Sequence, residues 1–221
     1  MPTLNTAHKG YIQGTIDTTQ AAARDEASGT HVDATGAASA AIQWFRSSGR
    51  GGGTMRYVRT FFAFDTSGVT GTVSSCTLNV AGGGTLENGD AIGVKSTAFG
   101  GDGGTNLHNN DFNNVDFSTT YTDEIDWDKD GNNAFTLTSA ALTDIKNEDV
   151  FIIALVEADS DYTDTDTADG SFSCGINFGG TIQLDYTLAT GYGNKVNGVA
   201  SGNIGKVDGV ATANIEKVIG V

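Results

Sequence analysis

The chain has 221 residues, with 31 glycines, a single proline and a net charge of −15 from 12 basic and 27 acidic residues. This surplus of acidic groups disfavours nucleic-acid binding, because proteins bind phosphate backbones through lysine and arginine. No apolar run is long enough for a membrane-spanning helix, and the first fourteen residues lack the charged start and apolar core of a secretory signal, so neither membrane insertion nor a cleaved signal is expected.

Glycine, threonine, serine, asparagine and aspartate are plentiful, which is typical of an all-β chain with many tight turns. In chain order, we expect an extended segment at 3–20 and then a loop or short irregular piece at 21–40, in which residues 21–27 are alternatively one or two helical turns. The expected strands cover 40–48, 55–65, 72–82, 90–99, 134–138, 149–159 and 180–189. The stretch 100–120 is expected to be a loop, and 139–147 a short helix with Ser139 as its N-cap.

Eight or so short strands with turn-rich connections predict a jelly-roll-like β-sandwich for residues 1–189. Within it, residues 1–39 belong either to the sandwich or to an extended arm. The segment 55–65 has bulky residues at odd and even positions alike, so both faces of this strand are expected to be covered. Cys76 and Cys174 form either one disulfide or two buried free thiols.

Residues 190–221 form an extended tail that repeats Lys-Val-x-Gly-Val three times, at a spacing of 11 residues. Glycine and β-branched residues in every repeat disfavour a helix, so we expect extended pieces with tight turns at Asn197-Gly198 and Asp208-Gly209. An isolated hairpin is only marginally stable, so the apolar residues need a neighbouring surface; a disordered tail is the alternative. The predicted assembly contacts are Val196, Val199, Ile204, Val207, Val210, Ile215, Val218 and Val221.

The best candidate for a metal site is the segment DWDKDGNN, in which Asp126, Asp128, Asp130 and Gly131 occupy positions 1, 3, 5 and 6 of an EF-hand loop. Leu137 stands where that loop requires its last ligand, and helices are not expected on either side. The segment is therefore not an EF-hand, and a looser Ca²⁺ loop and a solvated turn both fit it. The acidic segment 157–170 is either a Ca²⁺ or Na⁺ site or a solvated loop, and Ca²⁺ is the cofactor that the sequence suggests.

No catalytic motif is evident. The histidines have no zinc-ligand spacing and no GxSxG elbow is present, so an enzyme is not expected. The aromatic residues Trp44, Trp127 and Tyr121 are candidates for stacking on sugar rings if they are exposed. The competing interpretation is that they belong to the core, where tryptophan is usually found in a sandwich.

The segment RYVRTFFAFDTSGVTGTVSSCTLNV (56–80) resembles the signature of a jelly-roll module of extracellular and phage proteins, the DNRLRE-type domain. The likeness extends loosely over residues 40–188. Cys76 stands where the pattern usually has alanine, and the matching residues are Arg59, Phe64, Asp65, Ser67, Val73, Ser75, Thr77 and Leu78. The tail resembles the KVNGV-type repeats that end many structural proteins of tailed phages.

Together the two resemblances imply a virion structural protein, either a capsid decoration protein, a head fibre or a tail component. Its partners would be copies of itself and other virion proteins. It would be assembled in the host cytoplasm and be extracellular in the mature particle. The alternative is a carbohydrate-binding attachment module, Ca²⁺-dependent if the Asp-rich loop binds a cation, that recognises surface glycans.

Overall fold

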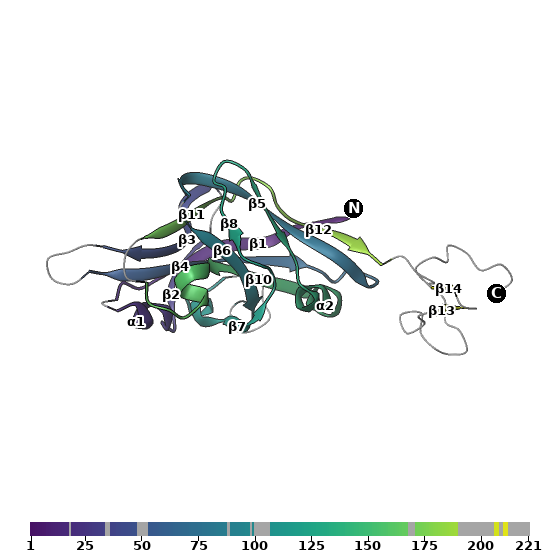
Figure 1. Ribbon diagram of the computed structural model, residues 1–221, viewed down its shortest axis with the longest axis horizontal. Coiled ribbons are helices and arrows are strands. Elements are labelled where there is room, and N and C mark those ends of the chain that lie inside the picture. The colour runs from purple at the N-terminus through teal and green to yellow at the C-terminus, as the bar shows by residue number, and fades with distance from the viewer. Residues whose placement is uncertain are drawn as a thin grey trace.

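The computed structural model describes the residues that carry the fold, namely 1–17, 19–33, 36–47, 53–87, 89–97, 99, 107–167, 171–189, 206–207 and 210–211. The chain is all-β, as expected, with few and short helices (Figure 1). No helix in this described part is both long and apolar enough to cross a membrane.

The body contains twelve strands in one continuous antiparallel network. Their bounds are β1 (Thr3–Gly14), β2 (Gly29–Asp33), β3 (Ala37–Arg46), β4 (Met55–Asp65), β5 (Val73–Glu87), β6 (Asp90–Ser96), β7 (Val115–Thr120), β8 (Ile125–Asp126), β9 (Asn132–Thr136), β10 (Val150–Glu157), β11 (Phe172–Asn177) and β12 (Ile182–Leu188). The helical elements are α1 (Gln20–Arg24), α2 (Ser139–Asn147), the 3₁₀ turn η1 (Asn109–Asn113) and the π turn η2 (Ala158–Tyr162).

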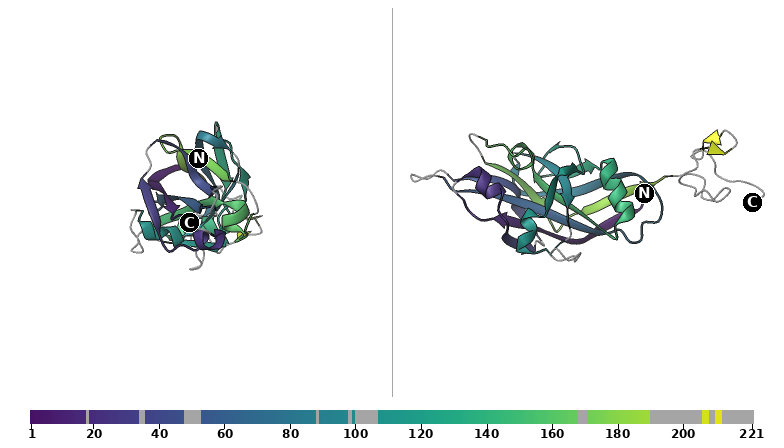
Figure 2. Two further views of the ribbon diagram at one scale, coloured as in Figure 1. Left: turned by 90° about the vertical axis from the view of Figure 1, so that its left-hand side faces the viewer. Right: turned by 90° about the horizontal axis from the view of Figure 1, so that it is seen from below.

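Six of the strands close a ring of pairings, in the order β1, β12, β5, β11, β3, β4 and back to β1. Strands β10, β6 and β7 extend the network from β4, and β2, β8 and β9 pair at its margins. Figures 1 and 2 show the resulting elongated body, with α1 at one end and α2 at the other.

Strand β4 separates two hydrophobic cores, which explains its continuous run of bulky residues. Phe62 and Phe64 lie in one core, together with residues of β5, β11 and β12. Tyr57, Phe61 and Ala63 point the other way, into a second core that also contains Ala23 of α1 and Phe112 of η1, among other residues. The expectation that both faces of this strand are covered is confirmed, because successive side chains of a strand alternate between its faces.

Strand β5 is longer than the predicted segment 72–82, because it continues through three glycines. A β-carbon at Gly82 would collide with the carbonyl oxygen of Asp128, and one at Gly83 would lie 2.8 Å from Asn177. Gly84 has φ +79°, in the left-handed region that side chains disfavour. The glycines therefore let β5 pass closely under its neighbours and pair with β11, instead of ending the strand.

The N-terminal residues are not an extended arm. Strand β1 belongs to the ring, where it pairs with β12 through residues 3–5 and with β4 through residues 6–13. Strand β2 pairs with the end of β1. Strands β2, β7, β8 and β11 were not expected from the sequence, and part of the predicted loop 100–120 is occupied by η1 and β7.

Cys76 and Cys174 are both buried free thiols, which settles the alternative left open by the sequence. Both lie in the same core as Phe62 and Phe64. Burial raises the pKa of Cys76 to about 12 and also raises the pKa of Cys174. These thiols therefore act as small apolar groups of the core.

Candidate functional site

The predicted metal ligands Asp126, Asp128 and Asp130 do not converge on one point. The Asp128 carboxylate accepts the backbone N–H of Asp130 at 2.9 Å and covers Gly131, while Asp130 forms an ion pair with Lys129. Asp126 lies in β8, away from this turn. The loop is an aspartate-stabilised turn of the kind that short polar side chains favour, and its three carboxylates are not among the described groups that lie close enough to share an ion. A cation bound by these three residues stays a prediction without support from this geometry.

A different group of carboxylates does come together at the start of β6. One carboxylate oxygen each from Asp90, Glu124 and Asp159 lies within 4.8 Å of the others. Asp90 is also the register partner of Asp126 in the pairing of β6 with β8, so these two side chains share one face. Burial, followed by the neighbouring Asp126 and Glu124, raises the pKa of Asp90 to about 6.

The Asp90→Asn variant is expected to gain stability relative to the unmodified protein as the pH rises. Because the folded-state pKa of Asp90 lies above its ordinary value of 3.8, its stabilising contribution is complete below about pH 4 and is lost as the pH rises through 6. Allowing for solvent screening, we expect a change of about 1 kcal/mol in the difference between the two proteins. Urea unfolding at pH 4 and pH 7 measures it, and an identical difference at both pH values would contradict the assignment.

The first turn of the acidic segment 157–170 is organised by one of its own carboxylates. Glu157 is 1% exposed and accepts the backbone N–H groups of Asp159, Ser160 and Asp161, at 2.9, 2.8 and 3.1 Å. It thereby caps η2. Burial raises the pKa of Glu157, although the three N–H donors oppose this by favouring the charged form.

A buried arginine neutralises the next carboxylate of this segment. Arg59 of β4 donates from Nε and Nη2 to the two oxygens of Asp161, at 2.8 and 2.6 Å, and both side chains are 1% exposed. Its remaining bonds go to the carbonyl oxygens of Phe112 and Arg24, and its guanidinium lies over the Phe112 ring. The two-pronged geometry and the additional bonds are what a buried ion pair needs to offset desolvation.

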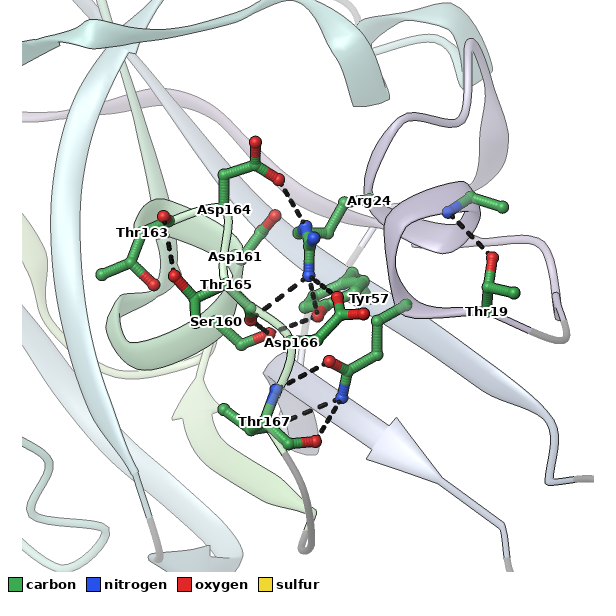
Figure 3. Close-up of polar contacts among 12 residues, drawn as sticks. Thr19, Arg24, Tyr57, Ser160, Asp161, Thr163, Asp164, Thr165, Asp166 and Thr167 are labelled. Carbon is green, nitrogen blue, oxygen red and sulfur yellow. Dashed lines mark hydrogen bonds and ion pairs between the residues drawn. The ribbon is translucent and has the colours of Figure 1, made fainter.

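A second arginine fixes the outer part of the segment, as Figure 3 shows. Arg24, at the end of α1, donates to Asp164 and Asp166 at 3.0 Å each and to the Tyr57 hydroxyl. The side-chain amide of Gln20 exchanges two hydrogen bonds with the backbone of Thr167. The described part of this segment is therefore held by two arginines and an amide of the body, while Asp159 belongs to the carboxylate group with Asp90 and Glu124. A cation site in this segment stays a prediction.

The aromatic candidates for sugar stacking are buried. Trp127 is 4% exposed and donates its indole N–H to the carbonyl oxygen of Gly175, and Tyr121 is 1% exposed and stacks on Phe151. Trp44 is fully buried against Tyr57. The expectation that Trp127 and Tyr121 bind a ligand by stacking is wrong, since rings inside a core have no free face.

A cavity of about 360 Å³ lies where α2 meets the start of β10. One wall carries Asp144, Glu148 and Asp149, and another carries Val150, Phe151 and Ile152 at the start of β10. The remaining lining residues are Lys95, Ser96, Thr97 and Tyr121. This volume is within the range of pockets that bind small ligands or single side chains.

Asp144 is the polar centre of this cavity. Lys95 donates to its Oδ2 at 2.7 Å, and the Tyr121 hydroxyl donates to the same oxygen. None of the described residues donates a hydrogen bond to the other carboxylate oxygen, Oδ1. Asp144 therefore keeps one oxygen available as an acceptor, and the pKa of its carboxyl is lowered, because the bonds from Lys95 and Tyr121 outweigh the opposing effect of burial.

The tail contributes a separate element. Lys206–Val207 (β13) and Val210–Ala211 (β14) pair antiparallel, with Val207 directly opposite Val210. Two residues, Asp208 and Gly209, separate the paired valines, as expected for a hairpin at this dipeptide. The other predicted assembly contacts, Val196, Val199, Ile204, Ile215, Val218 and Val221, lie outside the described residues.

Among the described residues, this small sheet is separate from the twelve-stranded network of the body. Strand β12 ends at Leu188, and Ala189 donates to the carbonyl oxygen of Thr72. The division of the chain at residue 189 stays a prediction. No family model matches the chain, and no curated protein matches it significantly. The likeness to DNRLRE-type modules and to KVNGV-type tails stays a prediction.

Proposed function

We propose that this chain is a non-enzymatic structural protein of a tailed-phage virion, which joins the particle through the repeats of residues 190–221. The body would be a jelly-roll-like unit displayed as a capsid decoration protein, a head fibre or a tail component. The observation that carries the proposal is the hairpin of β13 and β14, which forms its own sheet. A sheet of two strands of two residues is too small to be stable alone, and we assign its support to a neighbouring molecule.

The internal order of the body supports this role. Arg59, Arg24 and Glu157 hold the acidic segment through bonds between protein groups. In this proposal the acidic body is the part displayed on the particle, and the apolar, weakly basic tail is the part that attaches to it.

Deletion of residues 190–221 tests the proposal. We expect the truncated protein to fold, since the described tail residues contribute nothing to the body sheet, and to be lost from purified particles. The measurement is the amount of the protein in gradient-purified phage whose genome encodes either form, with circular dichroism as the control for folding. Normal incorporation of the truncated chain would refute the assembly role.

A Ca²⁺-dependent attachment module for surface glycans is the second candidate. The approach of Asp90, Glu124 and Asp159 favours it, because Ca²⁺ is bound by several carboxylate oxygens. Its aromatic platform is lost through the burial of Trp127 and Tyr121, so sugar recognition would depend on polar groups. Binding to a glycan array that disappears on chelation and in the Asp90→Asn variant would favour this candidate over a purely architectural one.

A further inference from the structure

Arg56, the second residue of β4, is an arginine whose charge no described carboxylate balances. None of the ion pairs among the described residues includes it, although the chain has 27 acidic residues against 12 basic ones. Its Nε atom is buried and has no hydrogen-bond partner. A buried donor without an acceptor is both costly and rare in folded proteins, so this side chain needs an explanation.

The two hydrogen bonds that Arg56 does make are long. Nη1 donates to Oε1 of Gln13 and Nη2 donates to Oε1 of Gln43, at 3.4 Å each, whereas N–H···O bonds usually measure about 2.7–3.2 Å. Each Nη atom carries two N–H groups, so Arg56 keeps one N–H on each of them in addition to the buried Nε–H. The edge formed by Nε and Nη2 is therefore available to an acceptor with two oxygen atoms.

Arg59, three residues further along β4, shows how this chain binds such an acceptor. It donates from Nε and Nη2 to the two oxygens of Asp161, at 2.8 and 2.6 Å. Arg59 lies at an odd position of the strand and Arg56 at an even one, so the two side chains point to opposite faces. Arg56 has the same edge of its guanidinium as Arg59, on a face where no described carboxylate meets it.

The groups around Arg56 are polar and uncharged. Gln13 of β1 and Gln43 of β3 are both register partners of Val58, which lies two residues after Arg56, so the polar side chains share one face of the sheet. Gln43 donates to the Ser173 hydroxyl at 2.6 Å, which orients its amide with the carbonyl oxygen toward Arg56. Gln13 and Arg56 are half-buried, whereas Gln43 and Ser173 are buried, so this polar group reaches from the interior to the surface.

Phe45 restricts the direction from which a ligand approaches Arg56. The guanidinium lies over the Phe45 ring, with its central carbon 5.4 Å from the ring centroid. Because the ring covers one face of the guanidinium, the in-plane N–H groups are the contact points that remain. The amide nitrogen of Gln13 makes no hydrogen bond to any described residue and adds a further donor. A planar anion with two oxygens matches these donors, and a carboxylate has this shape.

From these observations we infer that Arg56 and Gln13 form a binding site for the carboxylate group of a small organic anion. One oxygen of the carboxylate accepts from Nε and the other from Nη2, in the arrangement that Arg59 forms with Asp161. The Gln13 amide donates a further bond to one of these oxygens. The site is independent of the tail, so neither the assembly role nor the Ca²⁺-dependent alternative is needed for it.

A nuclear magnetic resonance titration of the full-length chain with sodium acetate tests the inference. The Nε–H signal of Arg56, assigned by its loss in Arg56→Lys, is expected to move downfield along a saturable curve, with a dissociation constant in the millimolar range. The Nε–H signal of Arg59 should stay in place, because its edge is already bound to Asp161. Sodium chloride at the same ionic strength is the control for screening and should move neither signal along a saturable curve.

The side-chain amide signal of Gln13 provides a readout that survives the loss of Arg56. Arg56→Lys keeps the positive charge but removes the planar edge, so acetate binding measured at Gln13 is expected to weaken about tenfold or more. The matched control is Arg46→Met, which removes the exposed arginine at the end of β3 and should leave the titration unchanged. Any of three results overturns the inference: no saturable shift of the Arg56 signal, an equal shift with chloride, or equal acetate binding by Arg56→Lys and the unmodified chain.

Discussion

Replacing Arg59 with methionine is expected to lower the free energy of unfolding by about 3–5 kcal/mol, because the Asp161 carboxylate would remain buried without its partner. Two carbonyl oxygens, those of Phe112 and Arg24, would lose their donors as well. Methionine keeps most of the apolar volume of the side chain, so the loss reports on charge and hydrogen bonding. Urea unfolding followed by fluorescence measures it.

Two further variants show whether burial of the ion pair causes the expected loss of stability in Arg59→Met. Arg24→Met removes an arginine whose carboxylate partners, Asp164 and Asp166, are 82% and 65% exposed, so the loss should be clearly smaller. In Arg59→Met/Asp161→Leu neither member of the ion pair is left as an unpaired buried charge, and we expect about 1 kcal/mol or more to be regained relative to Arg59→Met. Equal losses for the two single arginine variants would contradict a special role for the buried pair.

The local pattern of apolar residues was sufficient to predict the strands that contribute most to the two hydrophobic cores. The continuous bulky run of β4 and the apolar run of β10 were both recognised, because a strand covered on two faces must be apolar at successive positions. Strand β11 was missed since its sequence, FSCGIN, is short and contains glycine and serine. Its place between β3 and β5 depends on partners more than 80 residues away.

The functional groups were harder to predict because they depend on such long-range pairing. Arg59 and Asp161 are 102 residues apart, and only the packing of η2 against β4 brings them together. Asp126 was assigned to a metal loop from its local spacing, but its real neighbour is Asp90, across the pairing of β6 with β8. The spacing of carboxylates along a loop does not report the direction in which they point.

The hairpin of the tail was predictable for the opposite reason. The contact between Val207 and Val210 spans only the Asp-Gly dipeptide, and the preference of this dipeptide for tight turns acts locally. The surface that the hairpin contacts depends on complementary shape and charge. A repeat of eleven residues carries no information about that surface. The cavity beside α2 combines residues of β6, α2 and β10 and appears only once those elements are folded together.

Replacing Glu157 with glutamine is expected to cost about 3 kcal/mol, although the two side chains have nearly the same shape. Glutamate presents two acceptor oxygens to the N–H groups of Asp159, Ser160 and Asp161, whereas glutamine has one oxygen and an amino group that would face these donors. At least one N–H group would be left buried without an acceptor, at about 1–3 kcal/mol, and the charge assistance of the remaining bonds would be lost.

The matched control is Glu148→Gln, the same chemical change at an exposed residue after α2, where we expect a change within about 0.5 kcal/mol. Amide hydrogen exchange locates the effect, because faster exchange at residues 159–161 would show that η2 itself has loosened. That loosening also moves Asp161 relative to Arg59, so the losses of Glu157→Gln and Arg59→Met should be less than additive when combined. Fully additive losses would mean that the cap and the ion pair stabilise the acidic segment independently, in contradiction to the single network described for β4 and η2.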